Sequence, residues 1–237
     1  MLSLPFAAAG AAAWSLTEYC LHRFAGHGPR RKHDGRFVSW LTPSGFAAGF
    51  QEEHVAHHVN PDYFAPAWKK LTAAVIGVPA IGGLTSLVVG PRRGLSFAVG
   101  FMGAYLGYEV IHRRVHTHAP SGPYMRWVDR NHLHHHVNPK VNHGVTSPLW
   151  DHVFGTHVPI DGPVKLHVRM APSWMTDEAT GKVRPEHAAD YEVFGKRAPV
   201  EAAAALAHGQ CSRRTIASAW PFEPRSTSIV TSLSRSS

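Results

Sequence analysis

The chain has 237 residues, a formal net charge of +8 with histidine neutral, and a pI of about 9.8. This length fits one domain with tails or two small domains, and a basic balance favours anionic partners such as nucleic acid or a membrane surface. The absence of a helix-turn-helix or finger pattern argues against nucleic acid, and the two cysteines, Cys20 and Cys211, provide neither a disulfide framework nor a Cys-based zinc motif.

Three apolar stretches are candidate membrane spans. Residues 2–21 carry a single acidic residue, Glu18, near their end. Residues 71–91 are uncharged over the length of about 20 residues that a spanning helix needs, and residues 95–108 stay uncharged after the turn GPRRG. The last two stretches therefore predict a tight helical hairpin in lipid, with a buried hairpin of a soluble protein as the alternative. A cleaved signal peptide is a weaker interpretation of the first stretch.

Basic residues cluster next to these stretches, and the positive-inside rule predicts that the basic segments face the cytoplasm. The residues are Arg23, Arg30, Arg31, Lys32, Arg36, Lys69, Lys70, Arg113, Arg114, Arg126 and Arg130. Arg92 and Arg93 in the hairpin turn count weakly against this orientation. The predicted fold class is all-α, with about three membrane spans and a cytoplasmic, helical, histidine-rich di-metal part. The chain is predicted to form one domain over residues 1–208. A Ser-, Arg- and Pro-rich tail follows over residues 209–237 and is predicted to be disordered.

Histidines recur along the chain as pair, triplet, pair, triplet, in the segments HRFAGH, HVAHH, HRRVH and HLHHH. The ten residues are His22, His27, His54, His57, His58, His112, His116, His132, His135 and His136. Both triplets belong to nearly identical octapeptides, HVAHHVNP and HLHHHVNP. A solvated histidine-rich tract has no fixed spacing, so the repetition favours a built metal site over such a tract.

The spacing has a geometric meaning on a helix. Residues three or four apart lie on one face, so His54 can converge on a metal with either His57 or His58. Adjacent residues point roughly 100° apart, which allows neighbouring histidines to serve different metals. The pattern therefore predicts a two-metal centre with five ligands per metal and an open position for chemistry.

The four histidine boxes resemble those of the fatty acid hydroxylase superfamily of membrane di-metal enzymes, which includes sterol desaturases and C4-methyl oxidases. The segment NHGVTSPLWDHVFGT, residues 142–156, is similar to the stretch after the last box in fatty acid 2-hydroxylases that act on sphingolipid acyl chains. The resemblance implies that the ten histidines are ligands of two iron ions, with zinc able to replace iron in purified protein. It also implies O2 as the co-substrate.

By the same resemblance, the expected activity is that of an oxidoreductase that hydroxylates a lipid C–H bond with O2 and two electrons. The expected position is C2 of an acyl chain, because span-end histidines lie near the membrane surface and mid-chain carbons lie deeper. A sterol or carotenoid hydroxylase is the alternative within the superfamily. Because the chain has no room for the cytochrome b5-like domain that related enzymes often carry, a separate donor of cytochrome b5 or ferredoxin type, with its reductase, is expected.

A histidine-rich membrane metal-binding or transport protein is the alternative from another class. Such a protein should place its ligands at mid-membrane depth, whereas the boxes here follow the apolar stretches or lie in polar segments.

Five further residues are predicted close behind the metal ligands: Glu18, Glu109, Asn142, His143 and Asp151. The two glutamates precede the histidine pairs and are candidate acceptors for a ligand's second N–H. His143 stands where the family resemblance leads us to expect an aromatic residue, so it is either an extra ligand or a polar replacement. Seven further histidines outside the boxes are expected at the surface or behind the ligands: His118, His134, His152, His157, His167, His187 and His208.

Overall fold

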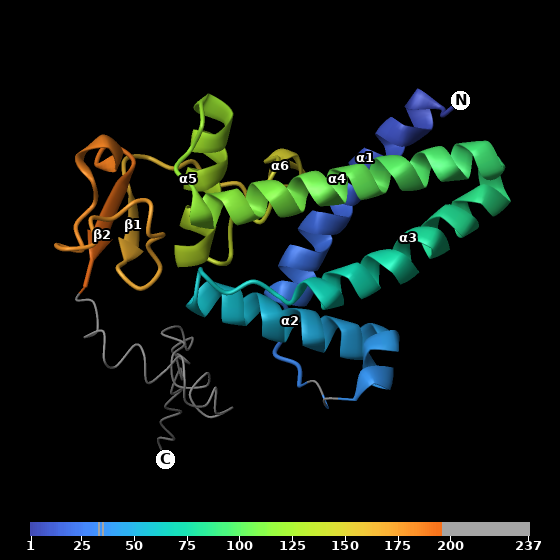
Figure 1. Ribbon diagram of the computed structural model, residues 1–237, viewed down its shortest axis with the longest axis horizontal. Helices are drawn as coiled ribbons and strands as arrows, with labels where there is room; N and C mark the ends of the chain where they lie inside the picture. Colours follow the sequence, from blue (N-terminus) through green and yellow to red (C-terminus); the bar gives the residue numbers. More distant parts are fainter. Residues whose placement is uncertain (33, 35, 196–237) are drawn as a thin grey trace, which may run out of the picture. The chain divides into compact units, whose positions relative to one another are not determined.

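The computed structural model describes residues 1–32, 34 and 36–195 (Figure 1). His208, the expected domain boundary at residue 208 and the predicted tail at 209–237 lie outside the described residues. The elements are α1 (Leu4–Cys20), η1 (Leu21–Gly26), η2 (Phe37–Leu41), α2 (Pro43–Val59), α3 (Ala67–Val89), α4 (Pro91–Thr117), α5 (Pro123–Val137), α6 (Leu149–Val153), β1 (Val164–His167), η3 (Pro185–His187) and β2 (Tyr191–Phe194).

Helices α4 and α5 begin in the same way, with a glycine followed by a proline. Gly90 has φ 87° and Gly122 has φ 108°, values in the left-handed region that glycine adopts without a steric penalty. Pro91 and Pro123 then occupy the first helical positions, where the missing N–H costs no hydrogen bond. The Gly90 turn joins α3 to α4, which confirms the predicted helical hairpin.

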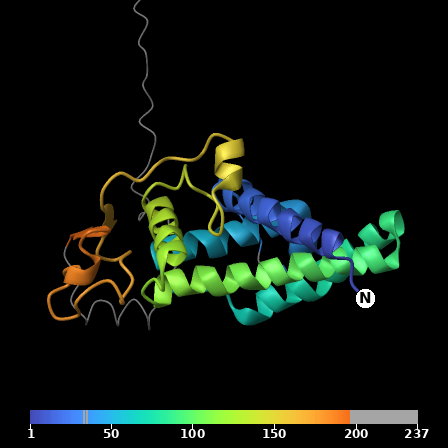
Figure 2. The same cartoon turned by 90° about the horizontal axis from the view of Figure 1, so that it is seen from above.

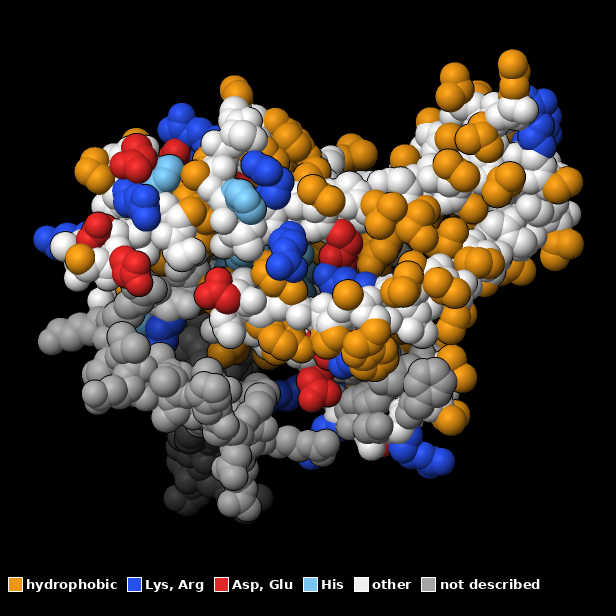
Figure 3. Space-filling view, viewed as in Figure 1, with side chains coloured by type: hydrophobic (Ala, Val, Ile, Leu, Met, Phe, Trp, Pro, Cys, Tyr) orange, Lys and Arg blue, Asp and Glu red, His pale blue; other side chains and the backbone are white. Residues whose placement is uncertain are grey.

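Two of the described helices, α3 and α4, are long and apolar enough to cross a membrane by length and composition. At 1.5 Å per residue they extend about 35 and about 40 Å, against a hydrocarbon core of about 30 Å. Helix α1 has 17 residues and extends about 26 Å, and η1 continues the helical segment without a break as far as Gly26. The first predicted span therefore stays a prediction. Apolar side chains are frequent along the α3–α4 hairpin, with basic side chains at its tip, whereas side chains of both charges gather towards the other end of the same face (Figure 3).

Helix α4 packs along α1 on one side and α3 on another (Figures 1 and 2). The α1–α4 contact depends on glycine, because a Cβ on Gly100 would lie 1.8 Å from the carbonyl oxygen of Ala7. Further along α1, the Trp14 ring meets Phe101 and Tyr105 edge-on, with centroids 5.3 and 4.8 Å apart. The close approach brings the C-terminal end of α1 against the part of α4 that leads to the histidines.

The all-α prediction was wrong for the last described part of the chain. Strands β1 and β2 form a two-stranded parallel sheet in which Val164 pairs with Tyr191 and His167 with Phe194. Each strand has only four residues, too few for a period-2 pattern to be distinguished from a polar loop. The sheet packs on α5 through a buried apolar core: Val115, Val128, Leu133, Val145, Val164, Leu166, Met175 and Tyr191.

The tight α1–α4 contact gives a matched pair of glycine substitutions within α4. Gly100→Ala should destabilise the protein by about 1–3 kcal/mol, because the added methyl group forces the two backbones apart. Gly103→Ala should be neutral or stabilising by up to about 1 kcal/mol, because its Cβ meets no atom within 4 Å. Thermal unfolding in detergent micelles measures both, and equal melting temperatures would contradict the close packing.

Candidate metal centre

All ten box histidines come together, and they form two groups of five. The first cluster is His22, His27, His54, His58 and His135, and the second cluster is His57, His112, His116, His132 and His136. Within each cluster, one ring nitrogen per residue lies within 4.8 Å of the corresponding nitrogens of the other four. Each cluster is therefore large enough in donors and small enough in span to surround one metal ion.

Helical spacing explains how the residues are divided. Three pairs lie four residues apart on one helix face and point into the same cluster: His54 with His58, His112 with His116, and His132 with His136. The residue between the members of a triplet points elsewhere, so His57 of α2 joins the second cluster and His135 of α5 joins the first. Helices α2 and α5 thus contribute to both clusters, and the stacked rings of His58 and His136, with centroids 4.1 Å apart, lie where the clusters adjoin.

The first histidine pair is spaced by five residues, and a π-helix accommodates this spacing. In η1 the His27 N–H donates to the His22 carbonyl at 3.1 Å, an i→i+5 hydrogen bond. The wider turn brings the two rings to a centroid distance of 5.3 Å. Gly26 lies against the His54 ring, where a Cβ would come within 2.6 Å of a ring carbon. The π-helix was not predicted from sequence, although the five-residue spacing in HRFAGH, against four in HRRVH, was its signal.

Three ligand candidates have their second nitrogen fixed by a backbone carbonyl. His22 Nδ1 lies 2.5 Å from the His143 oxygen, His57 Nδ1 lies 2.8 Å from the Tyr63 oxygen, and His135 Nδ1 lies 2.7 Å from the Val141 oxygen. A carbonyl only accepts, so the proton is on Nδ1 and a neutral ring keeps its lone pair on Nε2. These rings therefore present an unprotonated Nε2, the form that a metal requires, to the interior of their cluster.

The remaining nitrogens converge in a way that hydrogen bonding alone does not satisfy. Nε2 atoms approach one another at 2.8–3.1 Å, for example His27 to both His54 and His135. A neutral imidazole has only one N–H to donate. A set of converging imidazoles therefore has too few N–H donors to give every ring nitrogen a hydrogen bond. The buried Nε2 atoms of His22 and His58 have no hydrogen-bond partner among the described residues. A cation at the centre of each cluster would satisfy these lone pairs, so the donor set fits a metal.

The electrostatic environment favours neutral rings. Burial lowers the pKa of His27 to about 3 and that of His57 to about 4. Burial, with smaller contributions from neighbouring histidines, also holds the pKa of His58 and His135 well below the usual value. Metal binding requires deprotonated imidazole, so these side chains are in the binding form at neutral pH.

The residues predicted close behind the ligands lie near the two clusters. The two glutamates among them, however, do not accept an N–H from a cluster histidine as expected. Glu18 accepts the Val145 N–H at 2.8 Å, and Glu109 forms an ion pair with Lys70. Neither glutamate has a hydrogen bond to a cluster histidine among the described contacts. Asn142 has φ 54° and exchanges hydrogen bonds with Val158.

His143 belongs to the loop of residues 141–146, and the Asp151 side chain lies against this loop. Asp151 accepts the backbone N–H groups of His143 and Gly144. His143 is 2% exposed, and its ring lies 5.1 Å from that of His135, yet it is not one of the five donors of the first cluster. The remaining described histidines are exposed or partly exposed and lie outside both clusters: His118, His134, His152, His157, His167 and His187.

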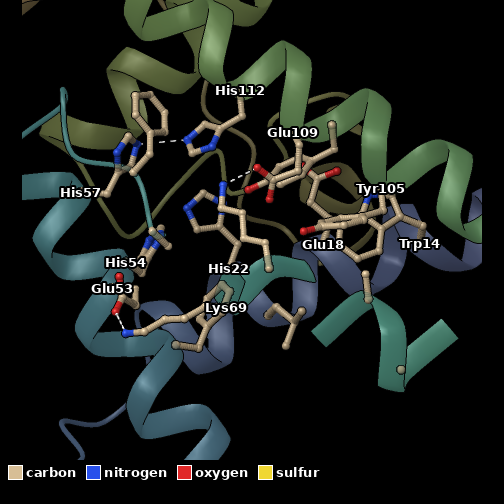
Figure 4. Close-up of a pocket in the computed structure, with 18 of the residues that line it drawn as sticks. Trp14, Glu18, His22, Glu53, His54, His57, Lys69, Tyr105, Glu109 and His112 are labelled. Carbon is tan, nitrogen blue, oxygen red and sulfur yellow. Dashed lines mark hydrogen bonds and ion pairs between the residues drawn. The ribbon is translucent and has the colours of Figure 1, made fainter. Parts of the chain in front are cut away.

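A pocket of about 260 Å³ lies between α1, α2, α3 and α4 and reaches both clusters (Figure 4). Its lining includes His22 and His54 of the first cluster and His57 and His112 of the second. The labelled imidazoles lie towards one end, whereas Trp14 and Tyr105 lie towards the other. The rest of the wall is largely apolar, with the ion pairs Lys69–Glu53 and Lys70–Glu109 beside the histidines.

The model of the fatty acid hydroxylase family matches residues 7–156, a range that includes all ten histidines and the pocket. The chain belongs to the fatty acid hydroxylase family. This membership confirms the resemblance inferred from the histidine boxes and the segment that follows them.

Several curated proteins are similar to this chain. A dihydroceramide fatty acyl 2-hydroxylase of Arabidopsis thaliana is 29% identical over 149 residues, which cover 62% of this chain and 58% of the relative. The ceramide very long chain fatty acid hydroxylase of Saccharomyces cerevisiae is 32% identical over 158 residues, covering 65% and 38%, and the human fatty acid 2-hydroxylase is 31% identical over 159 residues, covering 63% and 38%. The matched region thus spans between about two fifths and three fifths of these relatives.

A solved structure titled full-length scs7p, with only the hydroxylase domain visible, has a TM-score of 0.48 and 29% identity to this chain. The match covers 67% of this chain and 57% of that one.

The two clusters predict the metal content of the purified protein. Wild-type chains should hold close to two metals, and His57→Ala and His135→Ala should each lower this content because they remove ligands from different clusters. Elemental analysis against protein concentration provides the measurement. Unchanged metal content in both variants would contradict the assignment of the clusters.

Asp129 generates a prediction that does not depend on metal. This α5 carboxylate is fully buried without a hydrogen-bond partner among the described residues, and burial raises its pKa to about 8, against a smaller lowering by Arg114. Because the folded-state pKa exceeds the unfolded value of 3.8, Asp129 costs stability increasingly as the pH rises from 3.8 to about 8.

Asp129→Asn should therefore stabilise the fold by at least about 1 kcal/mol at pH 8, a rise of about 2–4 °C in Tm for a chain of this size. The gain should shrink towards pH 5. Thermal unfolding of both proteins across this pH range is the test, and a gain that grows on acidification would contradict the raised pKa.

Proposed function

We propose that this chain is a membrane di-iron oxygenase that hydroxylates C2 of a lipid acyl chain with O2 and two electrons. The observation that carries the proposal is the apolar pocket lined by histidines of both clusters, because it gives a lipid chain direct access to the metal-binding side chains. The relatives named dihydroceramide fatty acyl 2-hydroxylase and fatty acid 2-hydroxylase support the choice of an acyl chain and of its C2 atom. The relative named ceramide very long chain fatty acid hydroxylase supports the acyl chain.

The donor set is compatible with two iron ions as the cofactor. Neutral imidazole nitrogens bind iron and zinc alike, so zinc can replace iron in purified protein. The five imidazoles of each cluster would hold one ion each. When bound, the two irons supply the activation of O2 and the cleavage of the C–H bond.

The protein's own side chains bind the lipid and exclude water. Val78, Ile81 and Phe101 form part of the apolar wall that the acyl chain would contact. The ion pairs Lys69–Glu53 and Lys70–Glu109 make the wall polar beside the histidines. A lipid with its chain along the apolar wall would therefore place the polar group and the neighbouring C2 atom at the histidine end. The C–H bond is replaced by C–OH, and the second oxygen atom of O2 leaves as water after two electrons and two protons are taken up.

The clusters lie at the ends of helices, and this location bears on the transporter alternative and on the side of the membrane that the clusters face. His112 and His116 lie in the last two turns of α4, and the triplets lie at the ends of α2 and α5. A metal transporter would instead carry ligands at mid-membrane depth. The flanking basic residues support a cytoplasmic location of both clusters and a separate electron donor there, of cytochrome b5 or ferredoxin type with its reductase.

Isotope labelling tests the reaction. The purified, iron-loaded protein is reconstituted with donor and reductase under 18O2 and offered an acyl lipid, a sterol and a carotenoid in parallel. Label should be found in a 2-hydroxyacyl product, with a gain of one oxygen atom. Label only in the sterol or carotenoid would transfer the proposal to that substrate class. Absence of any labelled product, together with metal flux across vesicles, would overturn the enzyme assignment.

A bulky residue in the apolar wall should change chain-length preference. Gly77 lines the pocket, and a Cβ there would meet no atom within 4 Å, so Gly77→Phe fills the cavity with little strain in the protein. Turnover of long acyl chains should fall about tenfold or more, the equivalent of about 1.4 kcal/mol, with metal content unchanged.

Gly83→Phe is the matched control, because Gly83 lies on the same helix in open space and outside the pocket lining. Competition between short and long acyl lipids measures the preference of both variants. Equal preference in Gly77→Phe and wild type would show that the chain does not occupy this pocket.

A further inference from the structure

The loop of residues 141–146 fixes two ligands of the first cluster through its backbone. Its His143 carbonyl accepts from His22, and its Val141 carbonyl accepts from His135. These two rings come from η1 and α5, far apart in the sequence, and both belong to the first cluster. The position of this loop therefore decides where two of the five Nε2 atoms of that cluster point.

The Asp151 side chain holds the loop in place. Its Oδ1 accepts the His143 N–H at 2.8 Å and the Thr156 hydroxyl at 2.7 Å, and its Oδ2 accepts the Gly144 N–H at 2.8 Å. Asp151 is fully buried, so these three donors replace water around the carboxylate. A Cβ on Gly144 would lie 2.1 Å from the Ser147 carbonyl oxygen, so only glycine permits this loop conformation without displacement.

The second cluster is oriented differently. Its His57 donates to the Tyr63 carbonyl, which lies after α2 and not in the loop of residues 141–146. Among the described contacts, no ring nitrogen of the second cluster bonds to that loop. The series of hydrogen bonds that runs from Asp151 through the His143 backbone thus reaches the first cluster and not the second.

We propose that Asp151 is a positioning residue that sets the metal affinity of the first cluster independently of the second. The inference rests on the proposed function only in that both clusters must bind metal. Among the described interactions, the Asp151 side chain has no hydrogen bond to a cluster histidine. It acts through the His143 peptide unit, whose N–H it binds and whose carbonyl orients His22.

Asp151→Asn isolates this effect with little change in volume. The amide offers only one oxygen to the three donors, and its NH2 group faces an N–H that needs an acceptor. The loop must shift, and the carbonyl that orients His22 shifts with it. Loss of a partner behind a metal ligand lowers metal affinity about 10–100-fold in other metal sites, and here the loss should fall on one of two metals.

Zinc occupancy measured by competition with a chelator tests the proposal without any turnover assay. Wild-type protein, Asp151→Asn, Thr156→Val and Asp129→Asn are titrated side by side in detergent. Asp151→Asn should retain one tightly bound zinc per chain and bind the other 10–100-fold more weakly. Thr156→Val removes one of the three donors and should produce a smaller loss in the same site. Asp129→Asn is the matched control, because this buried carboxylate of α5 has no contact with the loop among the described interactions, and it should retain both metals.

A double substitution identifies the weakened site. His112→Ala with His116→Ala removes two of the five donors of the second cluster and should leave one zinc, and the addition of Asp151→Asn should weaken that last zinc. If the triple variant kept its last zinc as tightly as the double variant does, Asp151 would not act on the first cluster, and the proposal would be overturned. Two tight zinc ions in Asp151→Asn, or equal weakening of both, would overturn it as well. A wild-type chain that binds fewer than two metals would instead refute the assignment of the clusters in the proposed function.

Discussion

Ten imidazoles are gathered at the ends of helical segments, and each brings two ring nitrogens that need a partner away from water. Much of the described structure meets this requirement. Carbonyls after α2 and in the loop of residues 141–146 take one nitrogen of three rings, and convergence into two clusters directs the others to a common centre. The π-helix η1 and the extension of α4 as far as Thr117 bring histidines to that centre from helices that otherwise run through apolar surroundings.

Two buried carboxylates support the first cluster without belonging to it. Glu18 and Asp151 come from α1 and α6, and together they accept four successive backbone N–H groups, from His143 to Thr146. A buried carboxylate is costly unless its oxygens are hydrogen-bonded, and a loop with consecutive N–H groups supplies those bonds. The loop N–H groups thus find acceptors in the two carboxylates, and the buried carboxylate oxygens find donors in the loop.

The gathering of the ten box histidines could be predicted from sequence because histidine spacing and helix geometry act over a few residues. The pairing of His54 stayed open between His57 and His58, since both fit one helix face to within the tolerance of a side chain. The structure assigns His58, because His57 instead meets His112 and His116 across the helices. Such a choice depends on tertiary packing, which spacing along one helix does not encode.

Other features depended on contacts that no local pattern records. The partners of Glu18 and Asp151 lie in a loop whose conformation needs a left-handed Asn142 and the close contact at Gly144. The pocket is lined from four helices, and strands β1 and β2 pair across more than twenty residues of sequence. By contrast, the α3–α4 hairpin was predictable because the uncharged stretches of residues 71–91 and 95–108 mark the two helices and a glycine marks the turn between them.

The adjacent histidines His57–His58 and His135–His136 have a consequence for the geometry between the two clusters. Each adjacent pair sends one ring to either cluster from a single helix, so the distance between the cluster centres is set by the rise and pitch of α2 and α5. Helix backbone is much stiffer than a loop. Motions of the surrounding loops can tilt single rings. They leave the distance between the two cluster centres unchanged, because that distance depends on the backbones of α2 and α5. Under the proposed function, two metals held by these clusters would therefore keep a constant separation while a lipid enters and leaves.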